Sequence, residues 1–306
     1  MKNFGIVGGG SIGLLFAAYL SELRVNVKIY TRTKAQARKL NREGLILRKG
    51  KVVKKYDVEA VVCSEVEQFG DEVVFVAVKE YHLQKIFPHI LKSSDKMKSV
   101  VFLQNGMRHV NLLNRLTCKI DNIFIGIVEH GALKKSDNEV CHTGEGELKI
   151  GCYQQKSVLS YNLWNALNAV KFSTSQHENW LEIMEKKLVV NGVINPLTAI
   201  FNVRNGALIK NSYYFQLMKN LFDEISLIIK CNDNDWDNIV KICEKTAQNQ
   251  SSMAKDIIDG RQTEIDAISG FILEKADEQG LSLPNNLFVY NSIKGMQLQR
   301  KGEGDE

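Results

Sequence analysis

The first half of the chain alternates short apolar runs with segments of helical periodicity. A buried strand is expected over Phe4–Val7, then a helix over Ile12–Leu23 and an alternating strand over Val25–Tyr30. The same rhythm continues with a helix at Lys34–Arg42 and continuous apolar strands at Val73–Val78 and Val100–Leu103. Strands that alternate with helices in this order predict an α/β domain, a doubly wound parallel sheet with helices on both faces.

The second half of the chain has a different pattern. After Gly126 the sequence alternates and turns through glycine-rich points, which predicts antiparallel strands that close the sheet. From about Glu178 onward, long helical periods replace the strand signal. The expected helices are Trp180–Phe201, Ser212–Cys231 with Asn211 as a possible cap, Trp236–Gln248, Thr263–Asp277, and Asn286–Arg300 behind Pro284. The polar cluster at 172–178 is interpreted as a linker, so a domain of residues 1–175 is followed by an all-helical C-terminal domain of residues 176–306.

Composition supports this division and excludes several classes of protein. The chain has 306 residues, of which 44% are hydrophobic, and this length favours two domains. The net charge of +5 is spread along the chain, and no apolar window is long enough to span a membrane, so neither a nucleic acid nor a membrane is an expected partner. The six cysteines lack the spacing of a metal site. No metal is therefore expected, and the thiols indicate a cytoplasmic protein without a signal peptide.

A glycine-rich motif lies between the first expected strand and the first expected helix. It reads Gly8-Gly9-Gly10-Ser11-Ile12-Gly13, which fits G-x-G-x-x-G. Gly8 permits a tight turn, Gly10 lets the backbone approach a pyrophosphate, and Gly13 lets the helix pack on the strand. The motif therefore predicts a Rossmann-type domain that binds a dinucleotide; a glycine-rich turn without a ligand is the alternative.

The end of the second strand indicates which dinucleotide is bound. Sites for NAD usually have Asp or Glu at this position, whereas this strand ends in Tyr30-Thr31-Arg32. Because a guanidinium binds a phosphate bidentately, Arg32 predicts NADP(H). Lys34 and Arg38 could add positive charge or could be ordinary solvated residues of the next helix.

Two polar residues follow later strands of the expected sheet. Lys79 follows Val73–Val78, and Asn105 follows the strand that ends near Leu103. Ligands of open parallel sheets bind outside the carboxyl ends of the strands, so both side chains are expected to face the cofactor. The alternatives are a plain surface lysine and a simple turn at Asn105-Gly106.

One helix of the second domain carries a row of polar residues. Lys187, Asn191 and Asn195 have the spacing i, i+4, i+8, which places them on one face. The residues around them are apolar, so the row is expected to line a cleft. Pro196 removes a backbone donor from this helix and is expected to kink it. The alternative is a structural stripe in which Lys187 pairs with a carboxylate.

Several segments together resemble one enzyme family. They are KLVVNGVINPLTAIFNVRNG, NQSSMAKDIIDGRQTEID, LQNGM and the G-x-G-x-x-G motif. They lie in both domains and in the order found in the 2-dehydropantoate 2-reductase (ketopantoate reductase) family, and the similarity covers nearly the whole chain. The resemblance implies a Rossmann-type domain joined to a helical domain, with the active site between them. It also implies NADPH-dependent reduction of ketopantoate to pantoate for pantothenate and coenzyme A biosynthesis.

The resemblance assigns roles to individual residues. Lys187 matches the general acid, and Glu264 matches an acidic residue associated with the cofactor and with catalytic positioning. Asn105 matches a residue near both substrate and nicotinamide. The remaining matches are Asn191, Asn195, Asn205 and Ser252 for the substrate, and Arg32, Lys79 and Ala132 for the cofactor. The chain departs locally from the pattern at Gly9, between the first two motif glycines, and at MRHV after QNG.

The proposed roles fit the chemistry of hydride transfer to a 2-keto acid. Alkoxide charge develops on the former carbonyl oxygen, and desolvation would lower the pKa of Lys187 toward a value useful for proton donation. An ionised Glu264 nearby would oppose that shift. Ser252 could instead cap a helix, and His130 and His142 are interpreted as structural.

The sequence is also compatible with two other functions and with a homodimer. The chain could reduce a different branched 2-keto acid, or it could be an NADP-binding sensor that has lost its chemistry. The last helices could form the surface of a homodimer.

Overall fold

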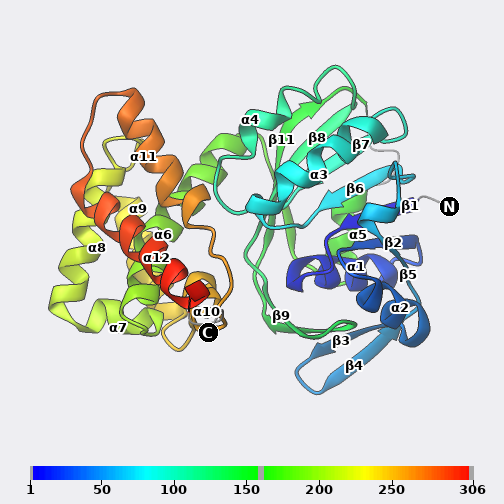
Figure 1. Cartoon of the computed structure of the whole chain (residues 1–306), viewed down its shortest axis with the longest axis horizontal. Helices are drawn as coiled ribbons and strands as arrows, with labels where there is room; N and C mark the ends of the chain where they lie inside the picture. The colour runs from blue at the N-terminus through cyan, green and yellow to red at the C-terminus, as the bar shows by residue number, and fades with distance from the viewer. Residues whose placement is uncertain (1–2, 158–161, 303–306) are drawn as a thin grey trace. The chain divides into compact units, whose positions relative to one another are not determined.

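The computed structural model describes residues 3–157 and 162–302 (Figure 1). Contacts divide the chain into two compact units. The first runs to Gln104 and continues from His109 to Ile183, and the second comprises Asn105–Arg108 and the chain from Met184 onward. The first unit thus continues past the expected boundary at residue 175. The reason is that Thr174–His177, within the expected linker, forms strand β12 and pairs in parallel with β11.

An eight-stranded sheet forms the centre of the first unit. In spatial order its strands are β12 (Thr174–His177), β11 (Leu148–Gln155), β8 (Asn122–Val128), β7 (Ser99–Phe102), β6 (Val73–Val76), β1 (Asn3–Val7), β2 (Asn26–Thr31) and β5 (Glu59–Val62). The strands from β8 to β5 are all parallel, and β11 pairs antiparallel with β8. The predicted α/β fold with a doubly wound parallel sheet is therefore confirmed.

Helices connect the parallel strands of this sheet. They are α1 (Ser11–Glu22), α2 (Lys34–Glu43), α3 (Glu80–Ser93), α4 (Val110–Leu113) and α5 (Leu163–Ala169), with a 3-10 turn η1 (Cys63–Glu65). Phe16 of α1 contacts the rings of Phe75 and Phe172, with centroids 5.4 and 5.2 Å apart. Every residue of α1 from Gly13 to Leu20 is buried. This helix is apolar on all sides because a second sheet also packs against it.

The second sheet corrects part of the sequence analysis. Its strands, in spatial order, are β4 (Val52–Tyr56), β3 (Leu45–Lys49), β10 (Glu139–Gly144) and β9 (Gly131–Ser136). The prediction that the segment after Gly126 closes the main sheet holds for β8 and β11 and is wrong for β9 and β10. These two strands leave the main sheet because β10 pairs with β3, with Val140 opposite Leu47. A pairing between residues so far apart in sequence leaves no local signal.

The second unit is helical. Its elements are α6 (Trp180–Ile200) from Met184 onward, α7 (Asn205–Lys210), α8 (Ser212–Ile225), α9 (Asp233–Lys245), α10 (Ser252–Ile258), η2 (Ile265–Ala267), α11 (Ser269–Glu278) and α12 (Pro284–Gly302). The cap at Asn211 is confirmed, since its side chain accepts from the N–H groups of Tyr213 and Tyr214. The single helix predicted over Thr263–Asp277 is wrong, because Ile268 leaves helical geometry and separates η2 from α11. In the described ranges, no helix is both long enough and apolar enough to cross a membrane.

A buried histidine gives the first unit a pH-dependent stability. His109 is 0% exposed and stacks on Phe102, and neither ring nitrogen has a hydrogen-bond partner among the described residues. Burial lowers the pKa of His109 to about 4. Because the unfolded chain binds a proton near pH 6.5 and the folded chain does not, stability is complete above that pH and falls as the pH drops toward 4.

We expect this histidine to account for about 2 kcal/mol of destabilisation between pH 7 and pH 5. His109→Leu should reduce the loss by that amount, because leucine takes up no proton in the unfolded chain. Urea unfolding of both proteins at the two pH values measures the effect. An unchanged pH dependence in the variant would contradict the assignment.

Candidate functional site

The glycine motif forms a turn that suits a pyrophosphate. Gly8 has φ +118°, and a Cβ on Gly13 would lie 1.8 Å from the carbonyl oxygen of Gly8. A Cβ on Gly10 would meet nothing within 4 Å, so it would project into open space. Gly10 begins α1 without a side-chain cap, and the N–H groups of the first turn have no side-chain acceptor. Open space in front of free backbone donors fits a dinucleotide phosphate.

Gln36 supports this turn, and the sequence analysis missed it. Its amide nitrogen donates to the carbonyl oxygens of Gly9 at 2.7 Å and of Asp137 at 2.9 Å. A Cβ on Gly9 would lie 2.6 Å from the same amide. A side chain at Gly9, which departed from the family pattern, would therefore displace the buried amide of Gln36. The role of Gln36 could not be predicted from the sequence, because Gln36 looks there like any other polar residue of an amphipathic helix.

Strand β9 lies beside the glycine motif. The hydroxyl oxygen of Ser11 accepts a hydrogen bond from the backbone N–H of Lys134 at 3.0 Å. Ala132, two residues earlier on β9, pairs with His142 of β10. This contact between β9 and the start of α1 brings Ala132 into the neighbourhood of the motif, as the assigned cofactor contact requires.

Positive side chains gather at the carboxyl ends of β2 and β6. Arg32 is exposed and, among the described residues, makes no ion pair or hydrogen bond. Lys79 occupies the N-cap position of α3 and is half-buried. Lys34 pairs with Glu65 at 2.6 Å, so its charge is already compensated. Arg38 is exposed on α2. Arg32, which directly follows β2, therefore has its charge available for a ligand.

The turn after β7 binds to the second unit. The amide nitrogen of Asn105 donates to the Glu264 carboxylate at 2.9 Å, and Glu264 is 8% exposed. Gly106 has φ +73°, and a Cβ there would lie 2.1 Å from the carbonyl oxygen of Ala267. The N–H of Met107 donates to that oxygen at 3.3 Å. Asn105-Gly106 is thus a turn, as the alternative interpretation held, and it also brings two predicted site residues together.

The polar row lies on α6. Lys187 and Asn191 are half-buried and Asn195 is 7% exposed, while the neighbouring Leu188, Val189, Val193 and Ile194 are buried. In the part of the chain that the structure describes, neither asparagine side chain has a hydrogen-bond partner. A structural stripe would have satisfied both amides. The two amides are therefore available to a ligand, and the ligand-binding role of the row stays a prediction.

The start of α10 corrects the interpretation of Ser252. The helix cap is Ser251, whose hydroxyl oxygen accepts from the N–H of Ala254 at 3.0 Å and from the hydroxyl of Thr198 at 2.8 Å. Ser251 is buried and Ser252 is exposed. The capping alternative for Ser252 is therefore wrong, and its hydroxyl is not used to cap the helix. Two adjacent serines made the cap ambiguous by one position in the sequence.

The side chain of Asn205 has an unsatisfied hydrogen-bond acceptor and lies near the residues that precede α10. Its amide nitrogen donates to the Thr246 hydroxyl at 2.8 Å, and its backbone N–H donates to the Asn249 carbonyl at 3.0 Å. The side-chain oxygen of Asn205 is buried and has no hydrogen-bond partner among the described residues. A buried orphan acceptor is costly unless a ligand supplies a donor.

The histidine pair belongs to the core of the first unit. His142 contacts the Tyr19 hydroxyl at 2.7 Å through Nδ1 and His130 at 3.2 Å through Nε2. Burial, followed by the nearby His130 and Lys49, lowers the pKa of His142 to about 4. Both rings are buried and packed around Phe172. This geometry supports the structural interpretation of both histidines.

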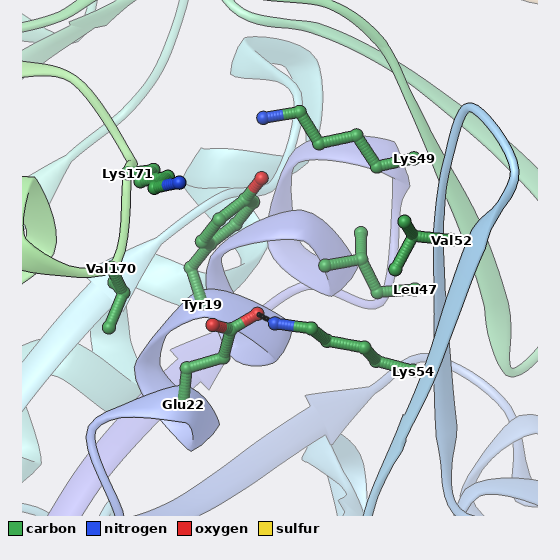
Figure 2. A pocket seen from close by; sticks show the side chains of 8 residues that line it. All are labelled: Tyr19, Glu22, Leu47, Lys49, Val52, Lys54, Val170 and Lys171. Atoms are coloured by element: carbon green, nitrogen blue, oxygen red, sulfur yellow. Dashed lines mark hydrogen bonds and ion pairs between the residues drawn. The ribbon is translucent and has the colours of Figure 1, made fainter.

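The first unit contains a cavity of about 140 Å³. Figure 2 shows the side chains that line it. It is lined by Tyr19, Glu22, Leu47, Lys49, Val52, Lys54, Val170 and Lys171. The Lys54 ammonium contacts the Glu22 carboxylate at 3.0 Å across it. None of the predicted site residues lines this cavity, so it is separate from the candidate site.

The fold and these residues define the class of two-unit dinucleotide-binding proteins. The family model "Ketopantoate reductase PanE/ApbA" matches residues 4–155, and "Ketopantoate reductase PanE/ApbA C terminal" matches residues 179–297. The chain belongs to the ketopantoate reductase family.

Individual relatives agree with this placement. The chain is 37% identical to 2-dehydropantoate 2-reductase of Bacillus subtilis over 96% of its own length and 97% of that protein. It is 36% identical to the enzyme of the same name from Listeria monocytogenes, over 98% and 97% of the two chains. The crystal structure of the probable B. subtilis enzyme matches with a TM-score of 0.83 at 36% identity, over 96% of this chain and 99% of that one. D-mandelate dehydrogenase with NADH shares the fold at 21% identity, with a TM-score of 0.85 over 98% and 99%.

Proposed function

We propose that this protein reduces 2-dehydropantoate to pantoate with NADPH, a step of pantothenate and coenzyme A biosynthesis. The observation that carries the proposal is the polar row on α6 in a family member. Lys187 places a half-buried ammonium there, and the amides of Asn191 and Asn195 have no hydrogen-bond partner among the described residues. Such groups suit a small ligand with several oxygen atoms.

Residues of the first unit hold the cofactor in this proposal. When bound, NADPH supplies the hydride that reduces the keto carbon. The backbone at Gly10 and the first turn of α1 bind the pyrophosphate, and Arg32 and Lys79 bind the 2′-phosphate. Asn105, whose amide nitrogen already binds Glu264, has its side-chain oxygen left as an acceptor for the nicotinamide or the substrate. Glu264 acts here as a positioning residue.

Residues of the second unit act on the substrate. Lys187 donates a proton to the carbonyl oxygen as alkoxide charge develops there. The amides of Asn191 and Asn195 bind substrate oxygens and add specificity without adding charge. The orphan oxygen of Asn205 accepts from the substrate hydroxyl, and the Ser252 hydroxyl binds the carboxylate.

A substrate panel tests the function. NADPH oxidation is followed with ketopantoate and with trimethylpyruvate, which has the same carbon skeleton without the hydroxyl. Because an orphan acceptor would reject the acid that lacks a donor, kcat/KM should be about 10²-fold higher for ketopantoate or more. A higher kcat/KM for another branched 2-keto acid would establish the alternative substrate. No turnover with any acid would favour an NADP-binding sensor.

Arg32→Ala should weaken NADPH binding by about tenfold to 100-fold and leave NADH binding unchanged. The reason is that a charge-assisted contact to phosphate contributes about 1.5–3 kcal/mol, and NADH has no 2′-phosphate. Fluorescence titration of both nucleotides measures the two Kd values. Arg38→Ala is the matched control, because Arg38 is also exposed and lies further along the chain, within α2. Equal losses for NADPH and NADH would contradict the role of Arg32.

The proposal places the enzyme in the cytoplasm, where the six free thiols of the chain stay reduced. Its partner is a small-molecule 2-keto acid. A homodimer stays a prediction.

A further inference from the structure

The first turn of α3 carries an imidazole among positive charges. His82 is half-buried, and its backbone N–H donates to the carbonyl oxygen of Lys79 at 2.9 Å. Lys79 and Lys85 lie three residues before and three residues after it. Lys85 is a neighbour of His82 on the helix surface, since side chains three residues apart on a helix lie close together. Lys79 is the N-cap residue of the same helix, and both charges act on the imidazole.

Arg32 adds a third cation from a different element. It follows β2, and its guanidinium lies close enough to act on the charge of His82. Burial has the largest effect on the pKa of His82, followed by Arg32, Lys85 and Lys79, and all four lower it from its usual value. The ring of Tyr81 packs edge-on against the imidazole at 4.5 Å between centroids. Burial and the three cations therefore all favour the neutral form of the imidazole.

We propose that His82 is a further ligand of the 2′-phosphate and takes up a proton from solvent when NADP(H) binds. This inference rests on the proposed function and on Arg32 as its phosphate contact. A phosphate monoester carries a charge of about −1.5 to −2 at pH 7, which reverses the sign of the field at the imidazole. The proton is added to a ring nitrogen, and no covalent bond is formed or broken. His82 thus makes the preference for NADPH over NADH increase as the pH falls.

Calorimetry measures the proton directly. NADPH is titrated into the protein at pH 7 in two buffers with different enthalpies of ionisation, and the difference gives the number of protons taken up. The wild type should take up a fraction of a proton more than His82→Gln. NADH should give no such difference between the two proteins. The 2′-phosphate has a second pKa of about 6 and holds only about 0.1 proton at pH 7, so the proton that it can release on binding is small in both proteins.

Affinity at two pH values provides the second measurement. Between pH 8 and pH 6 the ratio of the NADH Kd to the NADPH Kd should rise about threefold to tenfold more in the wild type than in His82→Gln. His82→Lys, whose charge is permanent, should show the higher NADPH affinity at both values. These results would support the proposal.

Equal proton uptake in the wild type and His82→Gln, or equal pH dependence of the affinity ratio, would overturn it. Failure of the underlying function is recognised separately. If the wild type does not prefer NADPH to NADH, or if Arg32→Ala leaves that preference intact, the cofactor assignment itself fails. If Arg32→Ala removes the preference and His82→Gln changes nothing, only the role of His82 is refuted.

Discussion

Lys187→Ala should lower kcat by about 10²-fold or more and leave the Kd for NADPH unchanged. The ammonium is the proton donor of the proposed reaction, and no other residue of the polar row on α6 can donate a proton to an alkoxide, because Asn191 and Asn195 carry amides. The lysine lies on α6 in the second unit, whereas the phosphate-binding loop lies in the first. Catalysis and cofactor affinity should therefore separate in this variant. Steady-state kinetics and a fluorescence titration of NADPH measure the two quantities.

Lys186→Ala is the matched control for this experiment. Lys186 is the preceding residue of the same helix and is exposed, so its loss changes the charge of α6 by the same amount without changing the polar row. We expect near wild-type kcat. The pH profile adds a second test, because the limb of the kcat profile that reports the general acid should disappear in Lys187→Ala and persist in Lys186→Ala. Near-normal turnover in Lys187→Ala would refute the acid assignment.

Local sequence patterns were sufficient to predict those features that depend only on the neighbouring residues in the chain. The strand, glycine turn and helix at the start of the chain were predictable because the backbone at Gly8 and Gly13 leaves no room for a side chain, while Gly10 completes the spacing of the motif. The polar row on α6 was predictable for a similar reason, since i, i+4 spacing fixes the face of a helix before any packing is known.

Contacts between distant segments were not predictable from these patterns. The second sheet depends on β10 pairing with β3, and the support of Gly9 depends on a glutamine of α2. Asn105 and Glu264 were assigned separately, but only the structure shows their hydrogen bond. The cap of α10 was ambiguous for a different reason, since either Ser251 or Ser252 could have capped the helix. Ser251 is the cap, and its hydroxyl oxygen also accepts from the buried Thr198 hydroxyl, a contact between distant segments.

Two alanine substitutions in the glycine motif should have different effects. Gly13→Ala should destabilise the protein by about 3 kcal/mol or more and abolish NADPH binding, because its Cβ would lie 1.8 Å from the carbonyl oxygen of Gly8 and α1 would have to move. Gly10→Ala should change the free energy of unfolding by less than about 1 kcal/mol, since its φ of −82° suits alanine and its Cβ would meet no atom within 4 Å.

The same open space in front of Gly10 is where the proposal places the pyrophosphate. A methyl group there would occupy the space needed by the phosphate oxygens, so Gly10→Ala should weaken NADPH and NADH binding alike by about tenfold or more. Urea unfolding and nucleotide titration of the two variants measure both effects. A Gly10→Ala protein that is stable and binds both nucleotides normally would show that this space does not hold a dinucleotide. Because Arg32→Ala affects NADPH alone, the two experiments distinguish the pyrophosphate site from the 2′-phosphate site.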